Sequence, residues 1–227
     1  FIIENSSMKN ALRIITSKKL GTLIVRNKDG YTTGMITDGQ IRRVSQKKNN
    51  LHDPWDIVDL FEKKIARFTG SKYAVAIDCC TNAIFLSLKY CNQKKTIIIP
   101  ENTYISVLSA IRLANYKFKV RKINWNGNYQ LNPLPIIDSA TKFTKNMYQR
   151  KTLTCLSFHH RKHLPIGRGG MVLLDSKKAY NWFKKARYDG RDLNVSYDKD
   201  NFKSIGWHMY MTPEQAYYGL TLLKKFK

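Results

Sequence analysis

From residue 54 onward, short apolar runs alternate with longer segments in which apolar residues recur every three or four positions. Short runs of this kind are typical of buried strands, and the longer segments are typical of amphipathic helices. The pattern predicts strands at 73–77, 96–99, 118–123, 136–138, 152–157 and 171–174, and helices at 54–70, 81–91, 104–115, 177–187 and 212–226. Because helices and strands alternate, we expect an α/β fold with a mainly parallel sheet flanked by helices.

The first part of the chain has a different order of elements. The pattern predicts a helix at 8–18, a strand at 22–26, a turn at 27–30, a strand at 31–36 and a helix that begins at Thr37. Two apolar strands joined by a short polar turn indicate a hairpin. We therefore expect a small α+β unit here.

A polar connector separates the two regions. Residues 46–50 contain only polar side chains, and Asp53 and Pro54 then supply an N-cap and a first-turn proline for a new helix. We expect domains at 1–48 and 54–227. The last predicted helix also has its own start signal, since Thr212 and Gln215 have the spacing of a capping box.

The composition is that of a folded globular protein, with 43% hydrophobic and 12% aromatic residues. A formal net charge of +24 raises nucleic acid as a partner, because clustered Lys and Arg neutralise phosphates. The Lys-Lys pairs are scattered along the chain, however, so nucleic-acid binding is not the favoured reading. A small anionic substrate suits the charge equally well.

Neither a membrane span nor a metal site is expected. No apolar run reaches the length that a membrane helix needs. Cys79, Cys80, Cys91 and Cys155 lack the spacing of metal ligands, and apolar surroundings favour reduced thiols in a cytoplasmic protein. The chain begins at Phe1 without an initiator Met, which indicates a fragment or a processed form.

The lysine with the most informative position is Lys162. It lies between two predicted strands, just before the glycine-rich run 167–170. A lysine amine can form a Schiff base with an aldehyde such as pyridoxal phosphate when its surroundings favour the neutral form. Lysine is abundant in this chain, so its position carries the argument.

Three further turns follow the carboxyl ends of predicted strands, where ligands gather in open α/β sheets. Residues 78–82 lead into a helix, and Thr81 with the backbone N–H groups could hold a phosphate. An ordinary capped helix would show the same residue pattern. Tyr104 could stack on a flat heterocycle. Asp138 ends a buried strand and could pair with a protonated pyridine nitrogen, or it could be an N-cap.

The stretch 20–43 resembles one repeat of a CBS domain. The resemblance implies binding of an adenosine nucleotide or, alternatively, a role in packing or dimerisation. Thr37 matches the family's ribose-binding threonine, while Gln40 stands where an acid is expected.

The second region resembles the DegT/StrS family of pyridoxal-phosphate-dependent sugar aminotransferases, which have the aspartate-aminotransferase type I fold. The match runs from about residue 61 to 223, and its clearest segments are FTGSKYAVA at 68–76, TNAIFLSL at 81–88 and GWHMYM at 206–211. The resemblance implies the large domain of that fold.

The resemblance also implies a role for each candidate residue. Lys162 would bind the cofactor covalently and later move protons, and Asp138 would hold the pyridine nitrogen. Tyr104 would stack on the ring. Thr81 and Ser157 would bind the phosphate, with Cys80 in the same turn, and His208 could reach the active site of the partner in a homodimer.

Several positions depart from the family pattern. Cys80 replaces a usual glycine, Thr141 replaces a usual Gln or His, and Arg168 replaces a usual glutamate. The connection at 120–138 is short, and the smaller C-terminal domain of the family is expected to be missing.

The implied function is transfer of an amino group from glutamate to a keto group of a nucleotide-linked sugar, for surface polysaccharide precursors. The alternative is a catalytically impaired regulatory or binding partner of a sugar-nucleotide enzyme.

Overall fold

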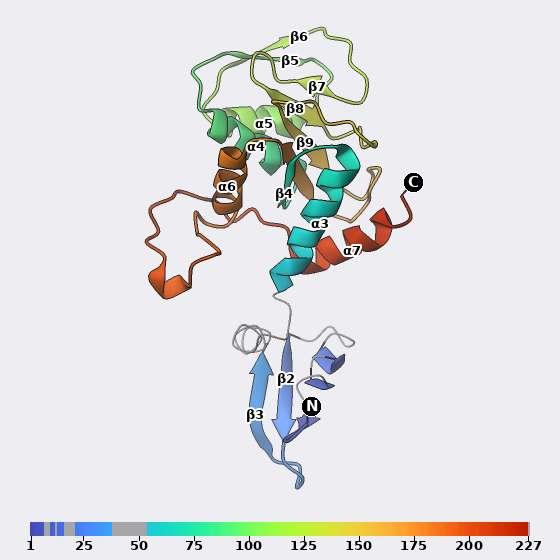
Figure 1. Ribbon diagram of the computed structural model, residues 1–227, viewed down its shortest axis with the longest axis vertical. Coiled ribbons are helices and arrows are strands. Elements are labelled where there is room, and N and C mark those ends of the chain that lie inside the picture. Colours follow the sequence, from blue (N-terminus) through green and yellow to red (C-terminus); the bar gives the residue numbers. More distant parts are fainter. Residues whose placement is uncertain (7–9, 12, 16–20, 38–53, 227) are drawn as a thin grey trace. The chain divides into compact units, whose positions relative to one another are not determined.

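The computed structural model describes residues 1–6, 10–11, 13–15, 21–37 and 54–226. The chain divides into two compact units, Phe1–Asp56 (unit 1) and Ile57–Lys227 (unit 2), and each is described by itself (Figure 1). Within the described residues, no helix has both the length and the apolar character needed to cross a membrane.

Unit 1 contains a three-stranded sheet in the order β1 (Ile2–Ile3), β2 (Thr22–Arg26) and β3 (Thr32–Thr37). β2 and β3 form the predicted antiparallel hairpin, and its turn is held by Asn27, whose Oδ1 accepts from the N–H groups of Asp29 and Tyr31. Residues 10–11 and 13–15 are helical. Ile2, Ala11, Ile15 and Leu23 form a small core.

Some expectations for this region fall outside the described residues. They are the ends of the 8–18 helix, the helix after Thr37, Gln40 and the connector at 46–50. The likeness to a CBS repeat therefore stays an expectation.

The main sheet of unit 2 has five strands in the order β4-β10-β9-β8-β7. They are β4 (Tyr73–Ile77), β10 (Gly170–Leu174), β9 (Leu153–Ser157), β8 (Ile136–Ser139) and β7 (Tyr129–Gln130). β8 and β9 are parallel, but β10 is antiparallel to both β4 and β9, and β7 is antiparallel to β8. The sheet is mixed, which corrects the prediction of a mainly parallel one. The reason is that β9 and β10 are joined by a loop at 158–169 and not by a helical crossover.

A second, parallel pair of strands consists of β5 (Ile97–Pro100) and β6 (Phe118–Arg121). It is linked to the segment after β7, because the N–H of Ile98 donates to the carbonyl oxygen of Asn132 at 2.7 Å. The turn after β5 is thereby held near β7.

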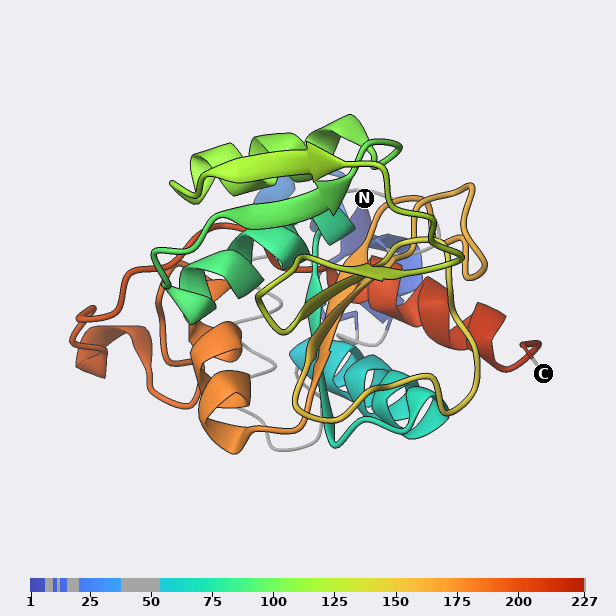
Figure 2. The ribbon, with the colours of Figure 1, turned by 90° about the horizontal axis from the view of Figure 1, so that it is seen from above.

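Helices flank the main sheet on both faces, as predicted. α4 (Cys80–Cys91) and α6 (Lys177–Ala186) lie on one side, and α3 (Pro54–Thr69) and α7 (Pro213–Leu223) on the other (Figure 2). α5 (Ile105–Leu113) packs on α4. Alternate strand residues such as Val75 and Ile77 share one buried cluster with α4 and α6. The predicted capping box of α7 is confirmed, since Thr212 and Gln215 cap each other.

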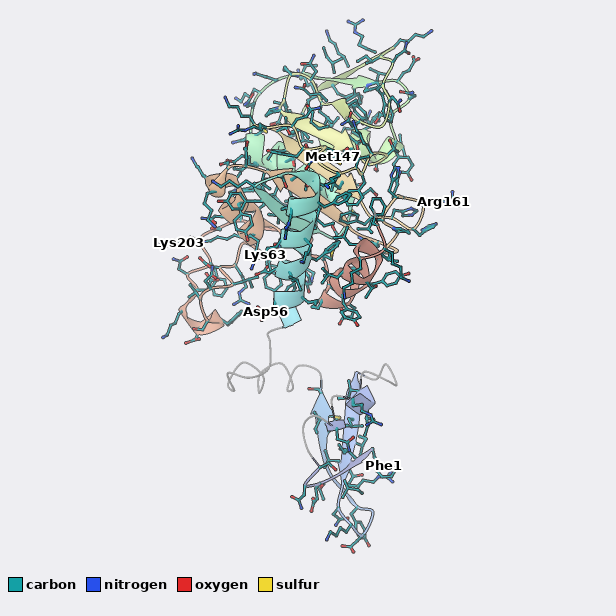
Figure 3. All side chains as sticks on the ribbon, turned by 45° about the vertical axis from the view of Figure 1, so that its right-hand side comes forward. Phe1, Asp56, Lys63, Met147, Arg161 and Lys203 are labelled. Atoms are coloured by element: carbon teal, nitrogen blue, oxygen red, sulfur yellow. The ribbon has the colours of Figure 1, made fainter. Side chains whose placement is uncertain are left out.

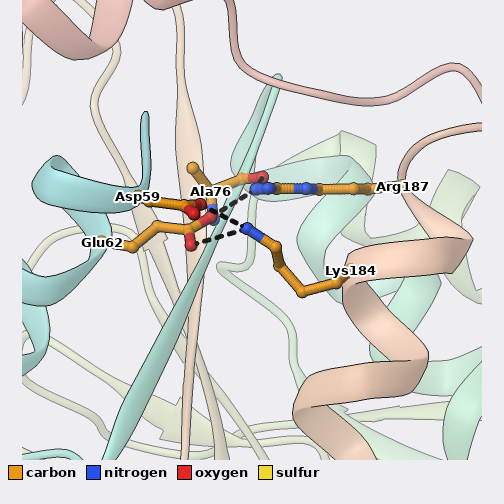
Figure 4. A network of polar contacts seen from close by, with 5 residues as sticks. All are labelled: Asp59, Glu62, Ala76, Lys184 and Arg187. Atoms are coloured by element: carbon orange, nitrogen blue, oxygen red, sulfur yellow. Dashed lines mark hydrogen bonds and ion pairs between the residues drawn. The ribbon is translucent and has the colours of Figure 1, made fainter. Parts of the chain in front are cut away.

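A buried polar network joins α3, β4 and α6 (Figure 4). Glu62 accepts from the N–H of Ala76 at 2.9 Å and from Nη1 of Arg187 at 2.5 Å, and Lys184 donates to Glu62 and Asp59 at 3.1 and 2.6 Å. Nη1 of Arg187 also donates to the carbonyl oxygen of Ala76. Glu62 and Arg187 are 3% and 1% exposed, so α3 is fixed to the sheet by a buried ion pair.

The segment 191–205 contains one short 3-10 helix, η1 (Tyr197–Lys199). The backbones of the two flanking residues, Gly190 and Gly206, cross in close contact. A Cβ on Gly190 would lie 1.9 Å from the carbonyl oxygen of Ser204, and one on Gly206 would lie 1.8 Å from the nitrogen of Gly190. Glycine is required at both positions because backbone meets backbone there.

Candidate functional site

The strand register brings the predicted site segments to one edge of the main sheet. β4, β8 and β9 run in the same direction, so their carboxyl ends lie together, and β10 begins where they end. Gly170 is paired with both Ile77 and Ser157. Asp138 is paired with Cys155, two residues before Ser157. The turns after these strands therefore share one edge.

Asp138 is buried in unit 2 and held from two sides. Its Oδ2 accepts from the hydroxyl of Tyr129 at 2.9 Å, and its Oδ1 accepts from the N–H of Ala140 at 3.0 Å. Burial raises the pKa of Asp138, while the two hydrogen bonds and the charge of Lys162 act in the opposite direction. Among the described residues, no cation lies within ion-pair distance of this carboxylate.

Lys162 is half-buried in the loop between β9 and β10. Leu164 and Ile166 anchor this loop in the core, while Arg161 is exposed and projects away from unit 2 (Figure 3). The charge of Lys162 lowers the pKa of both Asp138 and Cys80. Lys162 and Asp138 thus interact electrostatically, although no hydrogen bond or ion pair joins them.

The turn at 78–82 lies directly against the start of β10. A Cβ on Gly170 would be 2.3 Å from the carbonyl carbon of Cys79 and 2.5 Å from the nitrogen of Cys80, so Gly170 has to be a glycine. The Cys80 side chain is buried, and burial raises the pKa of its thiol well above the usual value. At the N-cap of α4, Cys79 makes no side-chain capping bond. The first N–H groups of α4 thus remain available to an anion.

The two helix starts at this edge are linked through Thr81. Its hydroxyl shares a hydrogen bond with the hydroxyl of Ser106 at 2.8 Å, which joins α4 to α5. Tyr104 is the N-cap of α5, and its side chain is 76% exposed. The preceding residue, Thr103, is hydrogen-bonded to the hydroxyl of Tyr129 and so connects this turn to Asp138.

Ser157 and His208 lie at the same edge with different partners. Ser157 is half-buried, and its hydroxyl accepts from the N–H of His159 at 3.4 Å. His208 is exposed, and its Nδ1 lies 2.9 Å from a carboxylate oxygen of Asp189. The next residue, Met209, accepts from the N–H of Asp78 through its carbonyl oxygen. The 206–211 segment is therefore fixed against the turn after β4.

Two features of the site were missed by sequence reasoning. Tyr129 belongs to a strand of two residues, which is too short for a hydrophobic period; the turn at Gly127, with φ +76°, was the available signal. Arg168 forms an ion pair of 2.8 Å with Asp78, and Asn82 donates to both oxygens of the same carboxylate. This ion pair ties the lysine loop to the turn at 78–82.

These features fit a flat, cationic heterocycle that carries a phosphate and an aldehyde. Asp138 is a buried carboxylate without a cation at ion-pair distance, Lys162 supplies an amine nearby, and the α4 start has uncapped N–H groups. A protonated pyridine nitrogen would supply the charge that Asp138 lacks.

Comparison with known proteins gives a consistent result. Residues 39–149 and 140–227 match the sequence model of the DegT/DnrJ/EryC1/StrS aminotransferase family. The spore coat polysaccharide biosynthesis protein SpsC of Bacillus subtilis is 26% identical over an alignment of 251 positions, and the match covers 86% of this chain and 64% of SpsC.

The chain also resembles solved structures. One is Helicobacter pylori PseC, an aminotransferase involved in the biosynthesis of pseudoaminic acid (TM-score 0.62, 19% identity, 74% of this chain and 57% of PseC). Another is DesI in the presence of its TDP-sugar product (TM-score 0.59, 17% identity, 75% of this chain and 53% of DesI). At these identities the likeness shows the fold. The chain spans less than two thirds of the length of each of these relatives.

Proposed function

Since the chain belongs to the DegT/DnrJ/EryC1/StrS aminotransferase family, we propose that it transfers an amino group from glutamate to a keto group of a nucleotide-linked sugar. Pyridoxal phosphate is the cofactor. The observation that carries the proposal is the buried Asp138 carboxylate, which is held by Tyr129 and the N–H of Ala140 and has no cation at ion-pair distance in the described part of the chain.

The chain's own residues hold the cofactor at four points. Asp138 pairs with the pyridine nitrogen, and Tyr104 covers a face of the ring. Thr81, Ser157 and the first N–H groups of α4 bind the phosphate, with Cys80 packed beneath that turn. Lys162 would supply the amine that holds the cofactor's aldehyde group.

When bound, pyridoxal phosphate would supply the aldehyde and the electron-withdrawing ring that transfer of an amino group requires. Lys162 moves the proton at the substrate carbon that bears the transferred nitrogen. Asp138 keeps the pyridine nitrogen protonated, because a cationic partner stabilises the charge of a buried carboxylate. His208 contacts phosphate or substrate across a homodimer.

The names of the same relatives support a proposal for the biological setting. SpsC is a spore coat polysaccharide biosynthesis protein, PseC is an aminotransferase involved in the biosynthesis of pseudoaminic acid, and DesI has a TDP-sugar product. We infer for this chain a role in precursors of surface polysaccharide, in the cytoplasm, with a nucleotide sugar as substrate.

A second candidate function is supported by the departures from the family pattern. The given sequence covers 64% of SpsC and 57% of PseC, and Cys80 and Arg168 stand where the family usually has glycine and glutamate. In that case the chain binds the cofactor and serves as a regulatory or binding partner of a complete sugar enzyme.

The decisive experiment is a titration of the purified chain with pyridoxal phosphate, followed by visible absorbance. The wild type should form the coloured, lysine-linked species, Lys162→Ala should not, and Lys178→Ala, which changes an exposed lysine outside the site, should behave as the wild type. Absence of the species in the wild type would refute both candidates. A transamination assay with glutamate and keto-sugar nucleotides then separates them.

A further inference from the structure

The hydroxyl group of Tyr129 lies between two other polar side chains. One is Thr103, in the turn after β5, and the other is Asp138, at the end of β8. Tyr129 and Asp138 are opposite each other in the antiparallel pair β7 and β8, so the backbone register places them together. All three residues belong to unit 2.

The direction of these hydrogen bonds follows from chemistry. An ionised carboxylate can only accept, so the single hydroxyl proton of Tyr129 is donated to Oδ2 of Asp138. The Tyr129 oxygen can then only accept, and Thr103 has to be the donor to it. The chain of donors runs from Thr103 through Tyr129 to Asp138, and each bond polarises the next.

The Tyr129 ring is itself held in place. It packs against Trp125 with 5.0 Å between ring centroids, and the indole nitrogen of Trp125 donates to Asn102 at 2.6 Å. Tyr129 is 8% exposed. A buried ring with a fixed neighbour presents its hydroxyl group in one direction, which is the requirement for orienting another side chain.

We propose that Tyr129, supported by Thr103, is the positioning residue that orients the Asp138 carboxylate toward the pyridine nitrogen of the bound cofactor. The inference rests on the proposed function of this site. The Tyr129 hydroxyl donates a hydrogen bond to Oδ2 and the N–H of Ala140 donates one to Oδ1, so both oxygens are held in place. Each oxygen keeps a lone pair that can accept from a cationic N–H group.

The charge state of Asp138 depends on the groups that face it. These are Tyr129 from β7, Cys80 from α4, Cys155 from β9 and Lys162 from the loop after β9. Burial raises the pKa of both thiols and of Tyr129, so these groups are neutral near neutral pH. Tyr129 and Lys162 favour the ionised carboxylate. Removal of the Tyr129 hydroxyl should therefore raise the pKa of Asp138 further.

The test compares Tyr129→Phe with Thr103→Val and with Tyr148→Phe. Tyr148 is a matched control, because its hydroxyl also makes a partly buried hydrogen bond, to the carbonyl oxygen of Thr152, away from Asp138. Tyr129→Phe should weaken binding of pyridoxal phosphate about tenfold, since a hydrogen bond to a charged group is lost. Thr103→Val should have a smaller effect, and Tyr148→Phe should have none.

The analogue of pyridoxal phosphate with carbon in place of the ring nitrogen separates positioning from packing. It has no N–H group for Asp138 to hold, so Tyr129→Phe should bind this analogue as tightly as the wild type does. The visible absorbance of the bound natural cofactor should also titrate at a different pH in Tyr129→Phe.

Two results would overturn the inference. One is equal loss of affinity for the cofactor and for the analogue, which would mean that Tyr129 only packs. The other is unchanged affinity and unchanged titration in Tyr129→Phe. A wild type that binds no cofactor would instead refute the proposed function on which the inference rests.

Discussion

Asp138 is the residue at which the needs of folding and of cofactor binding conflict. Its carboxyl is buried, and burial raises its pKa above the unfolded value of 3.8. A group of this kind stabilises the fold fully only below its unfolded pKa, and this contribution is lost as the pH rises through the folded pKa. Near neutral pH the ionised side chain therefore lowers the stability of the unliganded protein.

Asp138→Asn should accordingly make the unliganded protein more stable than the wild type near neutral pH. Asparagine can still accept from Ala140 and can donate to the oxygen of Tyr129, but it carries no charge. The difference should shrink as the pH falls through the raised pKa of the folded state, and it should vanish below about pH 3, where the wild-type carboxyl is protonated in both the folded and the unfolded state. Urea unfolding at both pH values measures it. An Asp138→Asn variant that is less stable at neutral pH would contradict the argument.

At the scale of elements, α3 is fixed to β4 and α6 by a charge network as well as by apolar packing. Glu62 is the centre of this network, and its partner Arg187 is 1% exposed. The gain from a buried ion pair is small when compared with apolar residues of the same volume, but breaking one leaves a buried charge without compensation.

Glu62→Ala should therefore lower the free energy of unfolding of unit 2 by about 3–5 kcal/mol. Asp59→Ala is the comparison, because Asp59 contacts the same Lys184 with a side chain that is 46% exposed. A loss of about 1 kcal/mol or less is expected for it. Urea unfolding followed by tryptophan fluorescence measures both, and equal losses would show that burial does not control the cost.

At the scale of the whole molecule, the chain carries a formal charge of +24. The basic residues occur along both units, and the loop between β9 and β10 carries Arg161, Lys162 and Arg168. A general positive field raises the encounter rate with anions without specifying any one of them, and salt screens it.

Binding to duplex DNA should therefore be weak and should fall steeply with salt. Each neutralised phosphate contributes to the slope of log K against log salt, so affinity should be largely lost between about 50 and 200 mM salt. Pyridoxal phosphate, held by a covalent link and a buried carboxylate, should remain bound over the same range. Fluorescence anisotropy with two unrelated DNA sequences gives the measurement, and a salt-resistant preference for one sequence would contradict this prediction.

The sequence was informative wherever an element is long enough to have a period. The strand at 73–77 is observed as β4 with the same bounds, and the helices predicted at 81–91 and 177–187 differ from α4 and α6 by one residue at one end. Capping residues helped, as Thr212 and Gln215 show. Local patterning therefore accounts for most of the elements in unit 2.

Strand direction and side-chain partners were beyond local patterning. The apolar residues of β10 predict a buried strand but not its direction. Its short connection to β9 makes it antiparallel. The Asp78–Arg168 contact joins residues 90 positions apart. Likewise, Tyr129 gains its role only when β7 pairs with β8. These features depend on the assembled sheet.

The glycine crossing at Gly190 and Gly206 has a consequence for protein engineering. Because the two ends of the 191–205 segment meet backbone to backbone, added residues within it would extend the chain beyond the crossing and leave the spacing of the sheet unchanged. An epitope tag or a fluorescent label inserted near η1 is therefore a means of following this protein without disturbing its strands.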